Sequence, residues 1–249
     1  LGMTALLLSI QSFTFIELTL LGLSTIAAII FCCFLLFTVF VLIEKKVRYP
    51  VVNIALFKIK NFTAGLIGMS SVQVIHGGWV ILIPMLFVSL GWSATLYGIL
   101  IFPFHIIRVI VSPISGYLTM KQGPNISSFL GLLAMIIGLL LAILYTPETG
   151  IPFVLGTMLL AGAGMSLFLP ANNTAIMSDI PKKYLSSASG FLAAARGVGI
   201  SIGSAIAVAV VTINDSSPQS FDIAIIALSG ISISGLLAII WRSNLGFTK

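Results

Sequence analysis

The chain has 249 residues, of which 59% are hydrophobic and only 7% are charged, and its mean hydropathy is +1.20. Soluble domains carry about 25% charged residues, so this composition excludes a water-soluble fold and indicates an integral membrane protein. The formal net charge of +6 does not point to nucleic acid as a partner, because the basic residues are not clustered into one binding face.

Apolar runs long enough to cross the hydrocarbon core, about 20 residues each, recur along the whole chain. The bilayer core has no water to bond the backbone, so such runs fold as helices. We therefore expect an all-α polytopic membrane protein with about eight transmembrane helices, in direct contact with the lipid bilayer. The predicted helices span 2–17, 21–43, 62–89, 93–119, 125–146, 151–178, 185–213 and 221–242.

The charges between these helices are sorted by side. If the helices alternate in direction, the loops on one side hold ten basic residues, whereas the loops on the other side hold no Lys or Arg. The positive-inside rule makes the basic side cytoplasmic. This predicts a multi-pass protein of the cell membrane with a cytoplasmic C-terminus. The ten are Lys45, Lys46, Arg48, Lys58, Lys60, Lys121, Lys182, Lys183, Arg242 and Lys249.

The longest connection, residues 44–61, reads "EKKVRYPVVNIALFKIKN" and is predicted to be a basic cytoplasmic loop. It separates the two helices of residues 1–43 from a compact block of six helices in residues 62–249, whose connections are short. We take this loop as the main boundary of the chain.

The predicted helix 93–119 carries a polar stripe in an otherwise apolar sequence. At about 100° per residue its polar side chains fall within an arc of roughly 80°. An arginine at mid-helix is costly in lipid, so the stripe faces a polar interior. Two interpretations stay open: a transport pathway, with His105 able to titrate near neutral pH and Arg108 binding an anion or gating, or a buried network that fixes packing. The stripe comprises Tyr97, His105, Arg108, Ser112, Ser115 and Thr119.

The neighbouring predicted helix, 62–89, places Gln73 and His76 one turn apart and therefore on one face. The same two alternatives apply to this pair: a place on the pathway, or a histidine hydrogen-bonded to a neighbour. Two histidines without nearby carboxylates make a poor metal site, so we expect neither a metal nor a cofactor.

The predicted helix 185–213 is rich in small residues. Gly199 and Gly203 form a G-x-x-x-G pair, and Gly197 belongs to a second row of small residues spaced by four. In lipid this spacing lets helix backbones approach closely, so these glycines are predicted to pack helices. For Arg196 in this helix three readings stay open: it reaches the membrane surface, pairs with Asp179, or lines the pathway.

Several kinds of chemistry have no sequence support. None of the six acidic residues lies in the middle of a predicted span, and no Gly-x-Ser-x-Gly, His-Glu-x-x-His or P-loop motif occurs. An intramembrane enzyme is therefore disfavoured, and we expect no enzymatic activity.

Three stretches together resemble the major facilitator superfamily: "IEKKVRYPVVNIALFKIKNF", "GYLTMKQGP" and "GAGMSLFLPANNTAIMSDIPKKYLSSASGFLAAARGVGISIGSA". The closest likeness is to its fourteen-helix drug:proton antiporters. The resemblance implies that residues 1–43 are two linker helices and residues 62–249 the second six-helix half. It also implies a gating loop at Gly116, Lys121 and Gly123, although Met120 stands where that motif carries an acid.

By this resemblance the protein is a secondary active transporter that exports small amphipathic molecules or drugs in exchange for protons, by rocking two halves about a central site. The chain would be a C-terminal part, paired with an N-terminal half that it lacks or with a second copy. The charge of the substrate stays open. Either the other half supplies the acidic residues that a cationic substrate would need, or the substrate is anionic or neutral. The alternative function is a non-transporting membrane relic or a regulatory partner subunit.

Overall fold

The computed structural model describes residues 54–213 and 218–243, together with seven isolated positions between residues 28 and 39. The first predicted helix lies outside the described residues, and so does the second apart from those seven positions. The predicted division at residues 44–61 and the count of eight helices therefore stay predictions.

The described part of the chain is built from helices in an antiparallel succession. Six of them are long and apolar enough to cross a membrane, and each coincides with one predicted helix to within a few residues. The 3₁₀ turns lie at the ends of these helices. The elements are η1 (Ile54–Lys58), α3 (Lys60–Ser89), α4 (Ala94–Gln122), α5 (Pro124–Leu141), η2 (Ala142–Leu144), α6 (Ile151–Met177), η3 (Lys182–Tyr184), α7 (Leu185–Ile213) and α8 (Pro218–Ser243).

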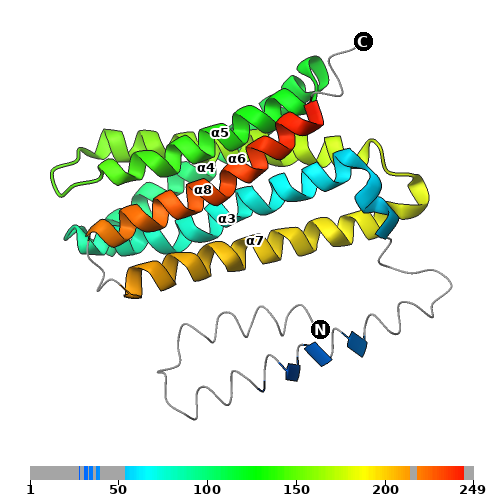
Figure 1. Cartoon of the computed structure of the whole chain (residues 1–249). Coiled ribbons are helices and arrows are strands. Elements are labelled where there is room, and N and C mark those ends of the chain that lie inside the picture. The colour runs from blue at the N-terminus through cyan, green and yellow to red at the C-terminus, as the bar shows by residue number, and fades with distance from the viewer. Residues whose placement is uncertain are drawn as a thin grey trace.

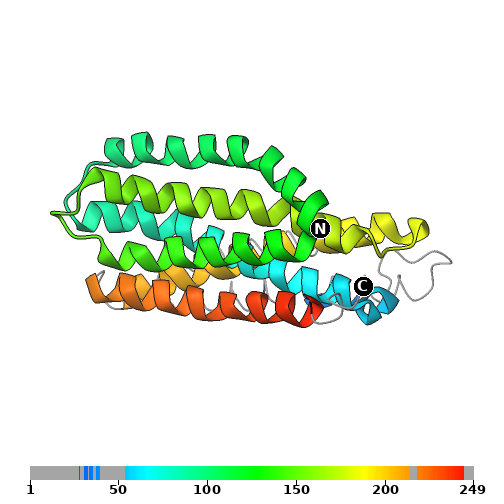
Figure 2. The ribbon, with the colours of Figure 1, turned by 90° about the horizontal axis from the view of Figure 1, so that it is seen from above.

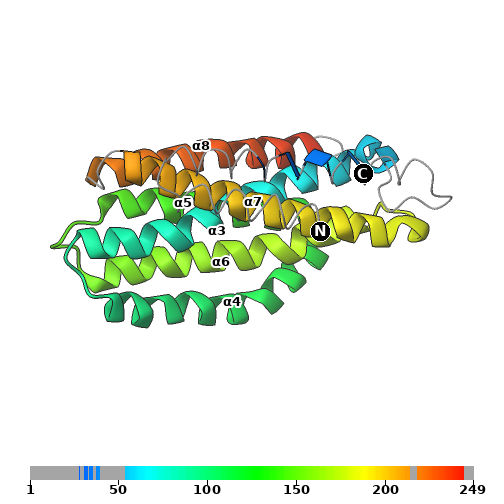
Figure 3. The same ribbon diagram turned by 90° about the horizontal axis from the view of Figure 1, so that it is seen from below.

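Helix α3 occupies the middle of the bundle, between α7 and α8, and α6 packs between α5 and α4 (Figures 1 and 3). Helix α4 lies at one edge, with α6 as its main neighbour (Figure 2). The burial of the helices follows from this order. In an apolar stretch of 18 residues, 67% of the residues of α3 are buried inside the protein, whereas in the corresponding stretch of α4 only 17% are. Most of the α4 surface is therefore left for lipid, for water or for another part of the protein.

Glycines set the closest contacts between the helices. A Cβ atom added at Gly203 of α7 would lie 2.0 Å from the backbone oxygen of Val74 in α3, and one at Gly77 would lie 2.2 Å from that of Ile200. On the other side of the bundle, a Cβ at Gly131 of α5 would meet the backbone oxygen of Gly164 in α6 at 2.6 Å. In membranes such small-residue contacts replace the hydrophobic driving force of soluble cores.

The two ends of the bundle differ in charge, as the loops predicted. Among the described residues, the end at which α3, α5 and α7 begin carries Lys58, Lys60, Lys121, Lys182 and Lys183. We call it the basic end. At the opposite end the described charged residues are Glu148 and Asp222.

The charge pattern groups Arg242 with the basic residues of the cytoplasmic loops, but its side chain does not lie on the surface. It lies in the last turn of α8 and is only 2% exposed. Its Nε donates to Oδ1 of Asn125 at 2.8 Å and its Nη1 donates to Oδ1 of Asn172 at 3.0 Å. These amide oxygens, supplied by α5 and α6, give the guanidinium polar partners inside the bundle, which is why the side chain turns inward.

Candidate functional site

Helix α4 begins with a side-chain cap and bends along its length. The hydroxyl oxygen of Ser93 accepts a hydrogen bond from the backbone N–H of Leu96 at 3.2 Å, which satisfies one free donor of the first turn. Pro103 and Pro113 lie inside the helix, and each removes one backbone hydrogen bond. The second half of α4 turns visibly away from the axis of its first half (Figures 2 and 3).

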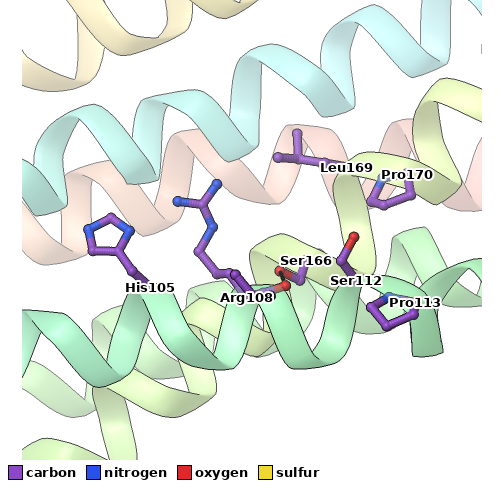
Figure 4. Close-up of a pocket in the computed structure, with 8 residues that line it drawn as sticks. His105, Arg108, Ser112, Pro113, Ser166, Leu169 and Pro170 are labelled. Carbon is purple, nitrogen blue, oxygen red and sulfur yellow. Dashed lines mark hydrogen bonds between the residues drawn. The ribbon is translucent and has the colours of Figure 1, made fainter.

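A recess of about 580 Å³ lies between α4 and α6, beside the middle of α4. We call it the basic recess. Part of its wall is polar and part is apolar, and the one arginine among its described lining residues, Arg108, comes from α4 (Figure 4). The lining residues are His105, Arg108, Val109, Ser112 and Pro113 of α4 and Ser166, Leu169 and Pro170 of α6.

The guanidinium of Arg108 is half-buried, and Figure 4 shows it extending toward α3 on the same side as the ring of His105. The guanidinium carbon lies 5.7 Å from the centre of the Phe104 ring, within cation–π range. Among the residues that the structure describes, no carboxylate and no hydrogen-bond acceptor pairs with this guanidinium. The backbone carbonyl of Arg108 accepts a hydrogen bond from the hydroxyl of Ser166 at 2.9 Å, which ties α4 to α6 at this level.

Helix α3 brings a further pair of polar side chains near this site, although none of its residues lines the recess. His76 is half-buried and lies within electrostatic reach of both Arg108 and His105. Its Nδ1 atom and the Oε1 atom of Gln73 are buried and, within the described part of the chain, have no hydrogen-bond partner. Buried polar atoms are normally paired. Helix α3 therefore holds two buried polar atoms without a hydrogen-bond partner among the described residues, and His76, which carries one of them, lies within electrostatic reach of Arg108.

The predicted stripe on α4 divides into three parts. His105, Arg108 and Ser112 line the recess. Tyr97 packs its ring 5.5 Å from that of Phe87 near the opposite end of the bundle.

The third part lies in the packed interior. Ser115 is buried and donates to the backbone oxygen of Leu167 at 2.9 Å, and Thr119 is also buried. The packing interpretation thus describes Ser115 well, whereas His105, Arg108 and Ser112 line the recess.

The residues of the predicted gating loop lie at the basic end of α4. Gly123 ends α4 with φ of +85°, and its N–H donates to the oxygen of Thr119. This backbone conformation favours glycine, and Pro124 starts α5 at once. Lys121 lies 5.9 Å from the ring of Tyr117, and a Cβ added at Gly116 would meet no atom within 4 Å. A tight turn between α4 and α5 is present, while a gating role stays a prediction.

On α7, Gly199 and Gly203 face α3, and a Cβ at Gly199 would lie 2.6 Å from the backbone oxygen of Ser70. Gly197 is half-buried on the same helix. Arg196 donates from Nη2 to Oδ1 of Asn173 at 3.4 Å.

This contact bears on the three readings of Arg196. Asn173 follows Pro170 by one helical turn, so Arg196 lies one turn from the recess toward the basic end. Asp179 instead accepts a hydrogen bond from Asn61 at 2.5 Å.

The α6 residues that line the recess were not among the site residues predicted from the sequence. Ser166, Leu169 and Pro170 carry no charge, and the segment "AGAGMSLFLPANN" reads first as a close-packing segment. The available signal was Pro170, which leaves a backbone carbonyl free within a span. Within the described residues, no three His, Cys, Asp or Glu side chains come close enough to hold a metal ion.

Comparison with known proteins agrees with this architecture. The chain is similar to the multidrug resistance protein Stp of Mycobacterium tuberculosis, 27% identical over 67% of this chain and 31% of Stp. It is also similar to the multidrug export protein EmrB of Escherichia coli, 29% identical over 73% of this chain and 35% of EmrB. The riboflavin transporter RibZ of Clostridioides difficile is 25% identical over 69% of this chain and 38% of RibZ.

The chain thus spans about a third of the length of these curated relatives. A family model described as Major Facilitator Superfamily matches residues 2–204, which is most of the chain and includes α3 to α6 and most of α7. The family match agrees with the apolar helical bundle and with the transporters among the relatives, and the chain therefore belongs to the major facilitator superfamily.

Proposed function

We propose that the chain is the C-terminal part of a secondary active transporter that exports small amphipathic molecules across the cell membrane in exchange for protons. The observation that carries the proposal is Arg108, a half-buried arginine at mid-helix whose guanidinium lies beside a recess and has no carboxylate and no hydrogen-bond acceptor as a partner among the described residues. Intramembrane charges of this kind mark substrate or ion pathways. The names of Stp and EmrB, which refer to multidrug resistance and export, support the substrate class.

In this proposal the six helices α3–α8 rock against an N-terminal half, and the substrate binds between the halves near mid-membrane. Residues 1–43 are two linker helices, and residues 44–61 are a cytoplasmic loop that places the basic end inside the cell. Gln73, His76, His105, Arg108 and Ser112 belong to the pathway. The turn with Gly116, Lys121 and Gly123 supports the movement at the cytoplasmic surface.

Transport by the full-length protein that contains this chain tests the proposal. The protein is reconstituted into vesicles, a pH gradient is imposed, and uptake is followed for an anionic, a neutral and a cationic aromatic dye. We expect uptake of at least one dye that stops when a protonophore collapses the gradient. Arg108→Ala should lower that uptake about tenfold or more, as expected when a charged interaction worth about 1.5–3 kcal/mol is lost.

The matched control is Lys182→Ala, which removes a positive charge from an exposed position at the basic end. It should transport normally, and both variants should insert into the membrane in normal amounts. Normal transport by Arg108→Ala would return the α4 stripe to a packing role. Absence of transport for every dye, with a correctly folded parent protein, would favour the non-transporting alternative.

A further inference from the structure

We infer that the basic recess binds the anionic head group of an amphipathic small molecule, and that the guanidinium of Arg108 pairs with this anion. The inference rests on the proposed function, because it names the substrate class of the same site.

The first argument is the unbalanced charge around Arg108. A guanidinium inside a membrane bundle is costly unless a partner neutralises it. The acids that the structure describes are Glu148, Asp179 and Asp222, and each lies at an end of the bundle or in a connection, away from the middle of α4. The described part of the protein therefore supplies no counter-charge at the level of the recess.

The second argument is the sign of the surrounding groups. His105 lines the recess beside Arg108, and His76 lies within electrostatic reach of both. Neither imidazole can supply the negative charge that the guanidinium lacks. An organic cation in the recess would therefore be repelled by the Arg108 guanidinium, whereas an anion would be attracted to it.

The third argument is the size and composition of the recess. Its volume of about 580 Å³ fits a small organic molecule. Beyond the polar groups around Arg108, the side chains of Pro113, Leu169 and Pro170 supply apolar lining (Figure 4). Val109 also lines the recess. A ligand with one charged head and one apolar body matches both walls.

The fourth argument is the geometry of the donors. The planar guanidinium can donate two parallel hydrogen bonds to a carboxylate, a sulfonate or a phosphate. The exposed hydroxyl of Ser112 lines the recess one turn along α4 and can donate a further bond. The hydroxyl of Ser166 instead already donates to the Arg108 carbonyl and holds that turn in place. The head group therefore belongs beside Arg108 and Ser112.

The test compares three probes that share one naphthalene ring. Naphthalene-2-sulfonate carries the anion, naphthalene-2-sulfonamide has nearly the same shape without the charge, and trimethyl(2-naphthyl)ammonium carries a cation. Binding is measured by equilibrium dialysis against the full-length protein in phosphatidylcholine nanodiscs, with empty nanodiscs as the blank. The variants are Arg108→Gln and Arg108→Lys. Lys182→Gln is the matched control, because it removes a positive charge from an exposed position at the basic end.

We expect the sulfonate to bind the parent protein about ten to a hundredfold more tightly than the sulfonamide, the range for a charge-assisted interaction. Arg108→Gln should remove this difference while leaving sulfonamide binding unchanged. Arg108→Lys should keep part of it, and Lys182→Gln should keep all of it.

Two results would overturn the inference. Equal binding of the three probes to the parent would show that the recess does not select charge. An equal loss of all three in Arg108→Gln, with a normal size-exclusion profile, would mean that Arg108 shapes the recess and does not pair with the anion.

Nanodiscs that contain phosphatidylglycerol distinguish a second source of the anion. If this lipid suppresses sulfonate binding to the parent but has no effect on Arg108→Gln, the occupant is a lipid head group and not a soluble substrate. Transport remains a separate readout. If the protein takes up dye in response to the pH gradient but binds the three probes equally, the anion site is refuted and the proposed function stands. If it binds the sulfonate selectively but shows no uptake driven by the gradient, the proposed function is refuted and the anion site stands.

Discussion

Replacing Gly203 with alanine should force α3 and α7 apart. The added Cβ would lie 2.0 Å from the backbone oxygen of Val74, 2.8 Å from its carbonyl carbon and 2.9 Å from the backbone nitrogen of Gly78, whereas ordinary contacts begin at 3.4 Å. All three atoms are backbone, so no side chain can rotate to make room. The helices must separate by more than an ångström at this level, and the neighbouring contact between Gly77 and Ile200 would be lost with them.

The expected cost is at the upper end for overpacking, about 3 kcal/mol. The apparent melting midpoint should therefore fall by several degrees, since the shift per kcal/mol becomes smaller as a protein becomes larger. The full-length protein in detergent is heated in steps, and the fraction that stays monodisperse is followed by fluorescence-detected size-exclusion chromatography.

The matched control is Gly190→Ala on the same helix, where an added Cβ meets no atom within 4 Å. It should leave the midpoint unchanged or raise it, because alanine favours a helix over glycine by up to about 1 kcal/mol. If Gly203→Ala melts together with the parent and with Gly190→Ala, the two backbones do not approach as closely as the packing argument requires.

Two further predictions concern polar groups away from the recess. Arg242→Ala should lower the free energy of unfolding by about 1–3 kcal/mol, because it leaves the amide oxygens of Asn125 and Asn172 without their donor; thermal melting should separate it from Lys182→Ala, which alters only an exposed side chain. Burial raises the pKa of Tyr145, which lies just beyond the end of α5, from 10.0 to about 12. Stability should therefore fall as the pH rises between these values, because the unfolded chain releases the phenol proton while the folded protein keeps it. Melting midpoints across this pH range should fall more steeply for the parent than for Tyr145→Phe.

Each of these predictions can fail cleanly. A midpoint of Arg242→Ala equal to that of the parent would mean that the buried guanidinium costs as much as its hydrogen bonds contribute, as is known for buried ions in soluble proteins. Parallel pH curves for the parent and Tyr145→Phe would mean that the phenol ionises at the same pH in the folded and unfolded states.

The existence of helices α3 to α8 could be predicted because it depends on local quantities. The transfer of an apolar run into a bilayer depends on its length and composition, and both can be read in the chain directly. The sorting of charge could be predicted as well, since it requires only the order of the loops. The prominence of Arg108 is a local signal of the same kind, because one arginine within an apolar run is costly wherever the helix packs.

The faces of the helices could not be predicted in the same way. Ser112 and Ser115 fall within one arc of the predicted stripe, yet Ser112 lines the recess and Ser115 is buried against Leu167 of α6. The sequence pattern treats the two serines alike. The difference arises because the backbone of α6 approaches α4 closely at Ser115, where the Leu167 oxygen lies 2.9 Å from the serine hydroxyl, and leaves open space at Ser112.

The sequence by itself therefore determined that the protein is helical and crosses the membrane, where the described spans lie, and that the loops of one side are basic while those of the other are not. It also singled out Arg108, the arginine that marks the recess. Only the tertiary structure decided that α6 supplies the other wall, that His76 lies within electrostatic reach of Arg108 and that Arg242 turns into the bundle. The physical reason is that lipid tails and neighbouring helices are equally apolar. Hydrophobicity identifies what enters the membrane, and it does not reveal which side of a helix meets another helix.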